Sequence, residues 1–227
     1  MKDFDSARLT LCYNSLLSHF GPQRWWPAKT AFEVAVGAIL TQNTSWRNVE
    51  RAIVNLRRAK CLRFDRMSAM SARDLARLIK PAGYYNMKAR RLKSFLDFLG
   101  QEFGGSMARM AKLDGRELRQ RLLSVHGIGE ETADAILLYA LDKSFFVVDA
   151  YTRRLALRHG WVSARVRYDE LQAFFMARLE ADVALFNEYH ALIVAVGKNY
   201  CKRSSPMCQE CPLSADLIAY HETISRD

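Results

Sequence analysis

Long apolar runs are absent from the sequence, and this absence excludes a membrane-spanning protein. A transmembrane helix needs about 20 consecutive apolar residues, and no such stretch occurs. The first residues, Met1 to Ser6, are polar and lack the pattern of a signal peptide. We therefore expect a cytoplasmic protein that does not bind membranes.

Alternation of polar and apolar residues is also nearly absent, which excludes a fold built on half-buried strands. Apolar residues instead recur at steps of three and four, as is typical of amphipathic helices. The sequence therefore predicts an all-α protein, with turn residues between its helices. The apolar segments are 32–40, 49–56, 75–79, 92–99, 118–125, 133–140, 171–179 and 190–196.

Negative charge is scarce relative to positive charge. Lys and Arg number 34 against 24 Asp and Glu, which gives a formal net charge of +10. This excess favours a polyanionic partner and salt-dependent binding, although a merely soluble basic protein would have the same balance. With 227 residues, half of them hydrophobic, the chain can form one domain or two small ones.

The most informative segment is 124–152, with the sequence SVHGIGEETADAILLYALDKSFFVVDAYT. Gly127 and Gly129 make a short hairpin before a helix, where backbone N–H groups can approach an anion such as a phosphate. The apolar run 145–148 then leads to one carboxylate, Asp149. The same residues are compatible with an ordinary helical corner and with Asp149 as a helix N-cap.

Hairpin, helix, apolar run and the motif VDAYTRR together resemble the helix-hairpin-helix and catalytic Asp of the endonuclease III superfamily of DNA glycosylases. The resemblance extends from about Trp25 to Leu213. It implies an all-α, two-lobed fold with a DNA-binding cleft between the lobes. A six-helix barrel would occupy residues 30–142, and residues 1–29 with 143–227 would form the second lobe and carry a cysteine-rich loop.

The resemblance also implies an activity, which is base excision from flipped nucleotides in damaged double-stranded DNA. Family members that also cut the strand have a lysine two residues after the second hairpin glycine. Glu131 stands there in this chain, and a carboxylate cannot form a Schiff base with the sugar. We expect a monofunctional glycosylase in which Asp149 stabilises the charge developing on the sugar, or activates a water.

Aromatic residues narrow the resemblance to the endonuclease III-like branch that removes 3-methyladenine and related alkylated purines. In that branch, aromatic residues at the positions of Trp25 and Trp46 sandwich the flipped base. The resemblance therefore implies that Trp25, Pro27 and Trp46 line the base pocket beside Glu131. A base alkylated at N3 is cationic, and an aromatic face attracts it by roughly 0.5–2 kcal/mol per contact. The alternative is that Trp25 or its neighbour Trp26 only anchors the fold.

Other contacts with DNA are implied by the same resemblance. Gln42 would fill the space of the flipped nucleotide or touch the orphan base. Tyr84 or Tyr85 would wedge into the duplex, and Lys88 would contact phosphates. These residues would otherwise form a tight turn and a solvated helix face.

Only five cysteines are present, and Cys201, Cys208 and Cys211 lie close together. Their spacing resembles the first three ligands of the C-x6-C-x2-C-x5-C iron–sulfur motif, and it favours a metal site. The fourth ligand position holds Leu217. The alternatives are a 3Fe–4S cluster, a 4Fe–4S cluster with a further ligand such as Asp216, zinc, or no metal.

The cysteine-rich loop would touch DNA phosphate through Lys202 and Arg203 with or without metal, and His190 is expected to be a core histidine. We expect a monomer associated with the nucleoid. Two alternatives to an alkylpurine glycosylase stay open. One is a mismatch or oxidised-base glycosylase of the same superfamily, and the other is a helix-hairpin-helix DNA-binding protein without catalysis.

Overall fold

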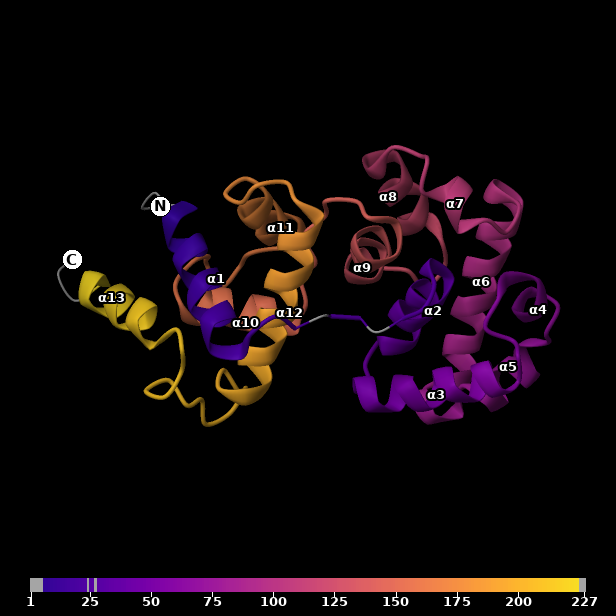
Figure 1. Ribbon diagram of the computed structural model, residues 1–227, viewed down its shortest axis with the longest axis horizontal. Helices are drawn as coiled ribbons and strands as arrows, with labels where there is room; N and C mark the ends of the chain where they lie inside the picture. The colour runs from indigo at the N-terminus through magenta and orange to yellow at the C-terminus, as the bar shows by residue number, and fades with distance from the viewer. Residues whose placement is uncertain (1–5, 24, 27, 225–227) are drawn as a thin grey trace. The chain divides into compact units, whose positions relative to one another are not determined.

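The computed structural model describes residues 6–23, 25–26 and 28–224, which form helices and no strand. This confirms the all-α class. The chain divides into two compact units (Figure 1). Unit 1 combines Met1–Trp25 with Ser144–Asp227, and unit 2 is Trp26–Lys143. None of the described helices is long and apolar enough to cross a membrane.

Unit 2 is built around α2, in which every residue from Phe32 to Leu40 is buried, and which packs against α9, α3 and α6. Its described residues contain six helices of seven residues or more and two shorter ones. The longer helices are α2 (Ala31–Thr41), α3 (Trp46–Arg58), α5 (Ala72–Leu78), α6 (Tyr85–Phe103), α8 (Gly115–Ser124) and α9 (Glu130–Leu141). The shorter elements are α4 (Phe64–Ser68), α7 (Met107–Met110) and the 3-10 turn η1 (Lys80–Ala82).

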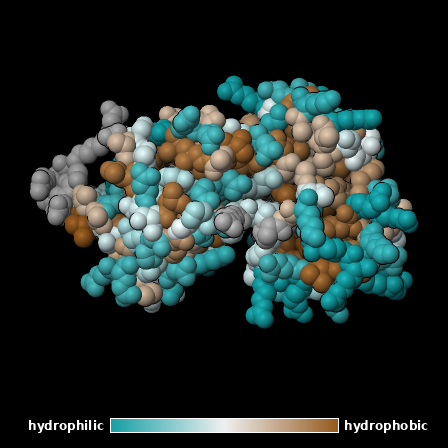
Figure 2. All heavy atoms as spheres, in the orientation of Figure 1, coloured by the Kyte–Doolittle hydropathy of each residue, from teal (hydrophilic) through white to brown (hydrophobic). Residues whose placement is uncertain are grey.

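The amphipathic pattern of α3 shows how the sequence determines this packing. Val49, Ala52, Ile53 and Leu56 are buried, and their spacing places them on one side of the helix. Figure 2 shows mostly hydrophilic side chains over the outer side of α3. The helix therefore contributes one face to the core and leaves the other to solvent.

Unit 1 is built around α12 (Val183–Asn199), which packs against α1 (Ser6–Phe20) and α10 (Ala150–Arg158). Its core includes parallel rings of Phe146 and Phe175, whose centroids lie 4.2 Å apart. The buried Tyr189 hydroxyl donates to Leu9 O at 2.9 Å and so joins α12 to α1. The remaining helices are α11 (Tyr168–Met176) and α13 (Ser214–Ile224).

All eight apolar segments lie in or overlap helices, whereas five of the described α-helices contain no such segment. The periodicity missed α4 and α7, which have only 5 and 4 residues. Such lengths span little more than one helical turn and cannot show a repeating apolar face. It also missed α1 and α13, which lie towards the two ends of the chain, and α10, which only the N-cap interpretation of Asp149 indicated.

The prediction that Lys88 contacts DNA phosphates is corrected by the structure, in which this side chain is buried within unit 2. Its ammonium donates to Leu40 O and Ala82 O, both at 2.8 Å. Burial, together with nearby Arg91, lowers the pKa of Lys88 to about 8. The spacing explains the error: Lys88 lies one turn before the buried Leu92 and belongs to the inner face of α6.

A buried ion pair joins the two hairpin helices, α8 and α9. Arg119 Nε and Nη2 donate to Asp134 Oδ1 and Oδ2 at 2.6 and 3.0 Å. The Asp134 side chain is 0% exposed and that of Arg119 is 18% exposed. Two parallel bonds to a carboxylate give both strength and a defined orientation. The pair therefore fixes how α8 enters the hairpin relative to α9.

Replacing Arg119 with Met should lower the free energy of unfolding by about 3–5 kcal/mol, because Asp134 would remain a buried charge without this cation. Arg121→Met on the same helix is the matched control. Arg121 pairs with the exposed Glu102 and Glu117, so its loss should cost about 0–1 kcal/mol. Urea unfolding followed by circular dichroism measures both. Equal losses in the two variants would contradict the special role of the buried pair.

Candidate functional site

The hairpin between α8 and α9 has the backbone expected of a phosphate-binding turn. Gly127 adopts φ +85°, and a Cβ there would lie 2.2 Å from Arg91 Cγ, so only glycine fits. Gly129 caps α9, and a Cβ there would meet nothing within 4 Å. An anion could approach the first N–H groups of α9 from this open side. The exposed Glu131 lies in the first turn of the same helix.

Gln42 follows α2 and is held against the hairpin. Its Nε2 donates to Gly127 O and Thr132 Oγ1, both at 2.9 Å. Its Oε1 accepts from Arg91 Nη1 at 2.5 Å. Both ends of the amide therefore have partners within unit 2. Entry of Gln42 into a duplex stays a prediction, and it would require the side chain to exchange these partners.

A pocket of about 260 Å³ lies between α2 and α3. Trp26 and Trp46 line it, with ring centroids 5.0 Å apart at 65°. Trp26 also stacks on Tyr139, at 5.0 Å and 22°. Of the predicted pocket residues, Trp46 lies here, Trp25 belongs to unit 1 and Pro27 lies outside the described residues.

Two carboxylates share the wall of this pocket with the tryptophans. Glu50 Oε1 accepts from Trp46 Nε1 at 2.9 Å. Glu33 is buried, and its Oε1 lies 2.5 Å from Arg57 Nη2. Aromatic faces attract cations, and carboxylates add to that attraction. Arg57, which also lines the pocket, offsets the charge of Glu33, so the preference for a cationic ring rests on the aromatic faces and on Glu50.

Asp149 immediately precedes α10 and caps it. Its Oδ1 accepts from Thr152 N at 2.7 Å and from Thr152 Oγ1 at 3.0 Å. Its Oδ2 lies 3.6 Å from His190 Nε2, an ion-pair distance. The cap and a chemical role are thus compatible, because the two oxygens of the carboxylate have different neighbours.

The surroundings of Asp149 keep it ionised. Burial would raise the pKa of Asp149, but contacts with His190 and Thr152 hold it below the ordinary value. His190 is buried as expected, and its ring meets that of Trp25 edge-on, with centroids 6.4 Å apart. Sequence reasoning missed its place beside Asp149, because the periodicity of α12 shows only that His190 faces inward.

Tyr84 is the more exposed of the two predicted wedge residues. It is 65% exposed and adopts φ +45°, directly before α6. Non-glycine residues adopt this left-handed conformation at a cost of about 1–3 kcal/mol, and such strain is often found at functional sites. Tyr85, the first residue of α6, is half-buried. The wedge role stays a prediction, with Tyr84 better placed than Tyr85.

The three cysteines of the predicted metal loop lie around one small cavity of about 10 Å³, which Leu217 also lines. This is about the space that a single water requires. Among the residues that the structure describes, no three His, Cys, Asp or Glu side chains are arranged to hold a metal ion. The donor set does not fit a 4Fe–4S cluster, which is normally held by four thiolates. Lys202 and Arg203 are exposed on the same loop.

Known DNA repair proteins are similar to this chain along most of its length. Residues 36–181 match the family described as HhH-GPD superfamily base excision DNA repair protein. The Methanocaldococcus jannaschii protein named "Putative DNA repair glycosylase MJ1434" is 46% identical over 94% of this chain and 97% of its own length. Endonuclease III of Sulfolobus acidocaldarius is 26% identical over 85% of this chain and 83% of its own length.

Two solved structures of DNA repair proteins are also similar to this chain. The crystal structure of H. pylori 3-methyladenine DNA glycosylase bound to 1,N6-ethenoadenine is 31% identical, with a TM-score of 0.71, over 86% of this chain and 98% of that one. A non-covalent endonuclease III–DNA complex has a TM-score of 0.81 over 98% and 100% of the two chains; at 19% identity it shows the fold alone. The resemblance to the endonuclease III superfamily is confirmed, and the chain belongs to the HhH-GPD superfamily of base excision DNA repair proteins.

Proposed function

We propose that this DNA repair glycosylase is monofunctional and removes alkylated purines such as 3-methyladenine from double-stranded DNA. The observation that carries the proposal is Asp149, a largely buried carboxylate kept ionised and fixed by Thr152 at the start of α10. The solved structure with 31% identity is a 3-methyladenine DNA glycosylase, which supports this substrate class.

Asp149 would act on the sugar as its bond to the base breaks. Positive charge develops at the anomeric carbon, and the ionised Oδ2 stabilises it or orients and deprotonates the attacking water. Thr152 holds Oδ1, so the carboxylate does not have to reorient during the reaction. Hydrolysis releases the free base and leaves an abasic sugar.

Base selection is assigned to the pocket with Trp26 and Trp46. A base alkylated at N3 carries positive charge, so it is a good leaving group and needs little protonation. The aromatic faces and the carboxylate of Glu50 would favour that charge over a neutral base, whereas Glu33 is paired with Arg57. Selection therefore rests on stacking and charge rather than on hydrogen bonds to base edges.

Strand cleavage is not expected from this chain. Glu131 occupies the position of the lyase lysine, on the exposed first turn of α9. A carboxylate cannot form the Schiff base that β-elimination requires. The product should be an abasic but continuous strand.

Asp149→Asn should reduce release of 3-methyladenine from methylated duplex DNA by about 10²–10⁴-fold, because the neutral amide cannot stabilise positive charge or accept a proton. The amide oxygen can still accept from Thr152, so folding and DNA binding should persist. Free base is measured by chromatography, and nicks by a denaturing gel without alkali.

In the same assay, borohydride should trap no covalent complex between the wild-type protein and abasic DNA. A trapped complex would show lyase chemistry through another lysine and would contradict the argument from Glu131. Absence of base release by the wild type, with DNA binding intact, would favour another lesion class or a non-catalytic DNA-binding protein.

Trp46→Ala should lower kcat/KM for 3-methyladenine about 5–150-fold, because stacking on one ring contributes ~1–3 kcal/mol per base. Trp46→Phe keeps an aromatic face and should retain most of the activity. Steady-state kinetics on methylated DNA compare the two variants. Similar activity in both would mean that the ring does not contact the base.

His190→Gln should move the acid limb of the pH profile for kcat/KM to higher pH. His190 lowers the pKa of Asp149, so its removal lets that pKa rise, and the carboxylate then loses its charge at a higher pH than in the wild type. At neutral pH, activity should change much less. His19→Gln, at the exposed end of α1 beside Tyr200, is the control and should leave the limb in place. If the acid limb of the pH profile is unchanged in His190→Gln, His190 has only a packing role.

A further inference from the structure

The cysteine-rich loop, residues 200–213, is held to the rest of unit 1 by ionic and hydrogen-bonded contacts. We propose that the Asp216 clasp, which consists of Asp216 with Arg8, His159 and Trp161, takes the structural place of an iron–sulfur cluster, so that this loop folds without metal. The inference concerns the architecture of unit 1 and does not depend on the substrate.

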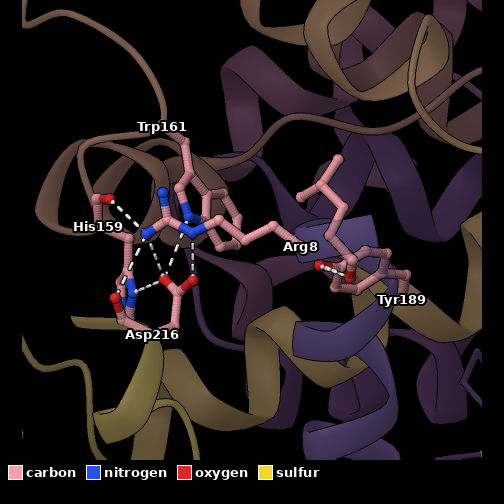
Figure 3. A network of polar contacts seen from close by, with 6 residues as sticks. Arg8, His159, Trp161, Tyr189 and Asp216 are labelled. Carbon is pink, nitrogen blue, oxygen red and sulfur yellow. Dashed lines mark hydrogen bonds and ion pairs between the residues drawn. The ribbon is translucent and has the colours of Figure 1, made fainter. Parts of the chain in front are cut away.

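The clasp joins segments that are far apart in the sequence (Figure 3). Arg8 on α1 donates through Nε to Asp216 Oδ1 and through Nη2 to Oδ2, the latter at 2.9 Å. His159 Nδ1 lies 2.6 Å from Oδ2, and Trp161 Nε1 donates to the same oxygen at 3.3 Å. The clasp therefore ties α13, just after the loop, to α1 and to the end of α10.

Asp216 was the candidate for a non-cysteine ligand, and the structure corrects that prediction. Its side chain is 11% exposed, and both of its oxygens accept bonds from the clasp. Burial would raise the pKa of Asp216, yet His159 and Arg8 lower it to about 2, so the carboxylate is ionised and already neutralised. A carboxylate with these partners is not available to the sulfur-lined cavity.

Two arginines of α10 hold the start of the loop. Arg154 donates to Cys201 O at 2.6 Å and to Gly197 O at 3.1 Å. Arg158 donates through Nη1 to Cys201 Sγ and to Lys202 O, both at 3.1 Å. One of the three sulfurs thus accepts a hydrogen bond from a cation. These contacts fix the beginning of the loop, and the clasp fixes the helix that follows it.

The cavity between the sulfurs has the space of about one water, so the several iron and sulfide atoms of a cluster do not fit there in this arrangement. Its volume is about 10 Å³, and Leu217 presents an apolar side chain where a fourth thiolate would stand. The buried Leu213 closes the end of the loop. Cys201 and Cys211 are therefore buried, as free cysteines commonly are, and Cys208 is half-buried.

The first test is the metal content of the full-length protein purified from iron-replete cells. Iron, zinc and acid-labile sulfide should each lie far below one atom per chain, and EDTA should leave the thermal unfolding midpoint unchanged. Stoichiometric zinc, or iron with sulfide and visible charge-transfer absorption, would overturn the proposal.

The second test compares three variants by thermal unfolding and by hydrogen exchange of residues 200–213. Asp216→Asn should lower the unfolding midpoint by roughly 5 °C or more and speed exchange in the loop, because it removes a largely buried charge from the clasp. Glu210→Gln removes an exposed carboxylate of the same loop and should change neither quantity. Cys208→Ala should also change little.

If the loop held a cluster, the order of these effects on stability would be reversed, because loss of a ligand cysteine would release the metal and unfold the loop. A larger loss of stability in Cys208→Ala than in Asp216→Asn would therefore contradict the clasp. Equal unfolding midpoints and exchange rates in Asp216→Asn and Glu210→Gln would also contradict it. If Asp216→Asn does not fold at all, the metal analysis of the wild type still decides the question.

Discussion

The chemistry proposed for unit 1 depends on keeping Asp149 largely buried and yet charged. Moving a carboxylate out of water is costly unless hydrogen bonds and opposite charge compensate. The N-terminus of α10 supplies donors from Thr152, and α12 brings His190 to the second oxygen. The partial positive charge at the start of a helix acts in the same direction. The packing of α10 against α12 is therefore a condition for the carboxylate to stay ionised.

Several of the basic side chains that contribute to the net charge of +10 bind groups within the fold. Lys88 joins the end of α2 to η1 by donating to Leu40 O and Ala82 O, and Arg91 donates to Gln42 beside the hairpin. Arg154 and Arg158 bind the backbone of the cysteine-rich loop. The net charge still attracts DNA at long range, but several of the cations that produce it have partners within the fold. Counting basic residues near a motif thus overestimates how many contact phosphate.

Local patterns were predictable from the sequence, whereas long-range pairs were not. Apolar periodicity located eight of the described helices, and the glycine hairpin with Asp149 located the superfamily motif, because each depends on residues close together in the chain. Periodicity could also have shown that Lys88 faces inward, since it shares a face with Leu92. The pairing of His190 with Asp149, and of Trp26 with Trp46, arises only when separate helices pack. Spacing along the chain carries no information about such partners.

The cysteine-rich loop illustrates the same limit in its strongest form. Three cysteines with the spacing of a cluster motif supply three ligands of a metal site. Metal binding is decided by the fourth ligand and by the space among the four positions. Here the residue at the fourth position is apolar, and its neighbour Asp216 binds Arg8 and His159 instead. An ion-pair clasp differs from a cluster in chemistry, because its strength does not depend on iron supply or on the oxidation state of sulfur. A repair enzyme whose loop is held in this way would keep its fold under the oxidising conditions in which thiolates are lost.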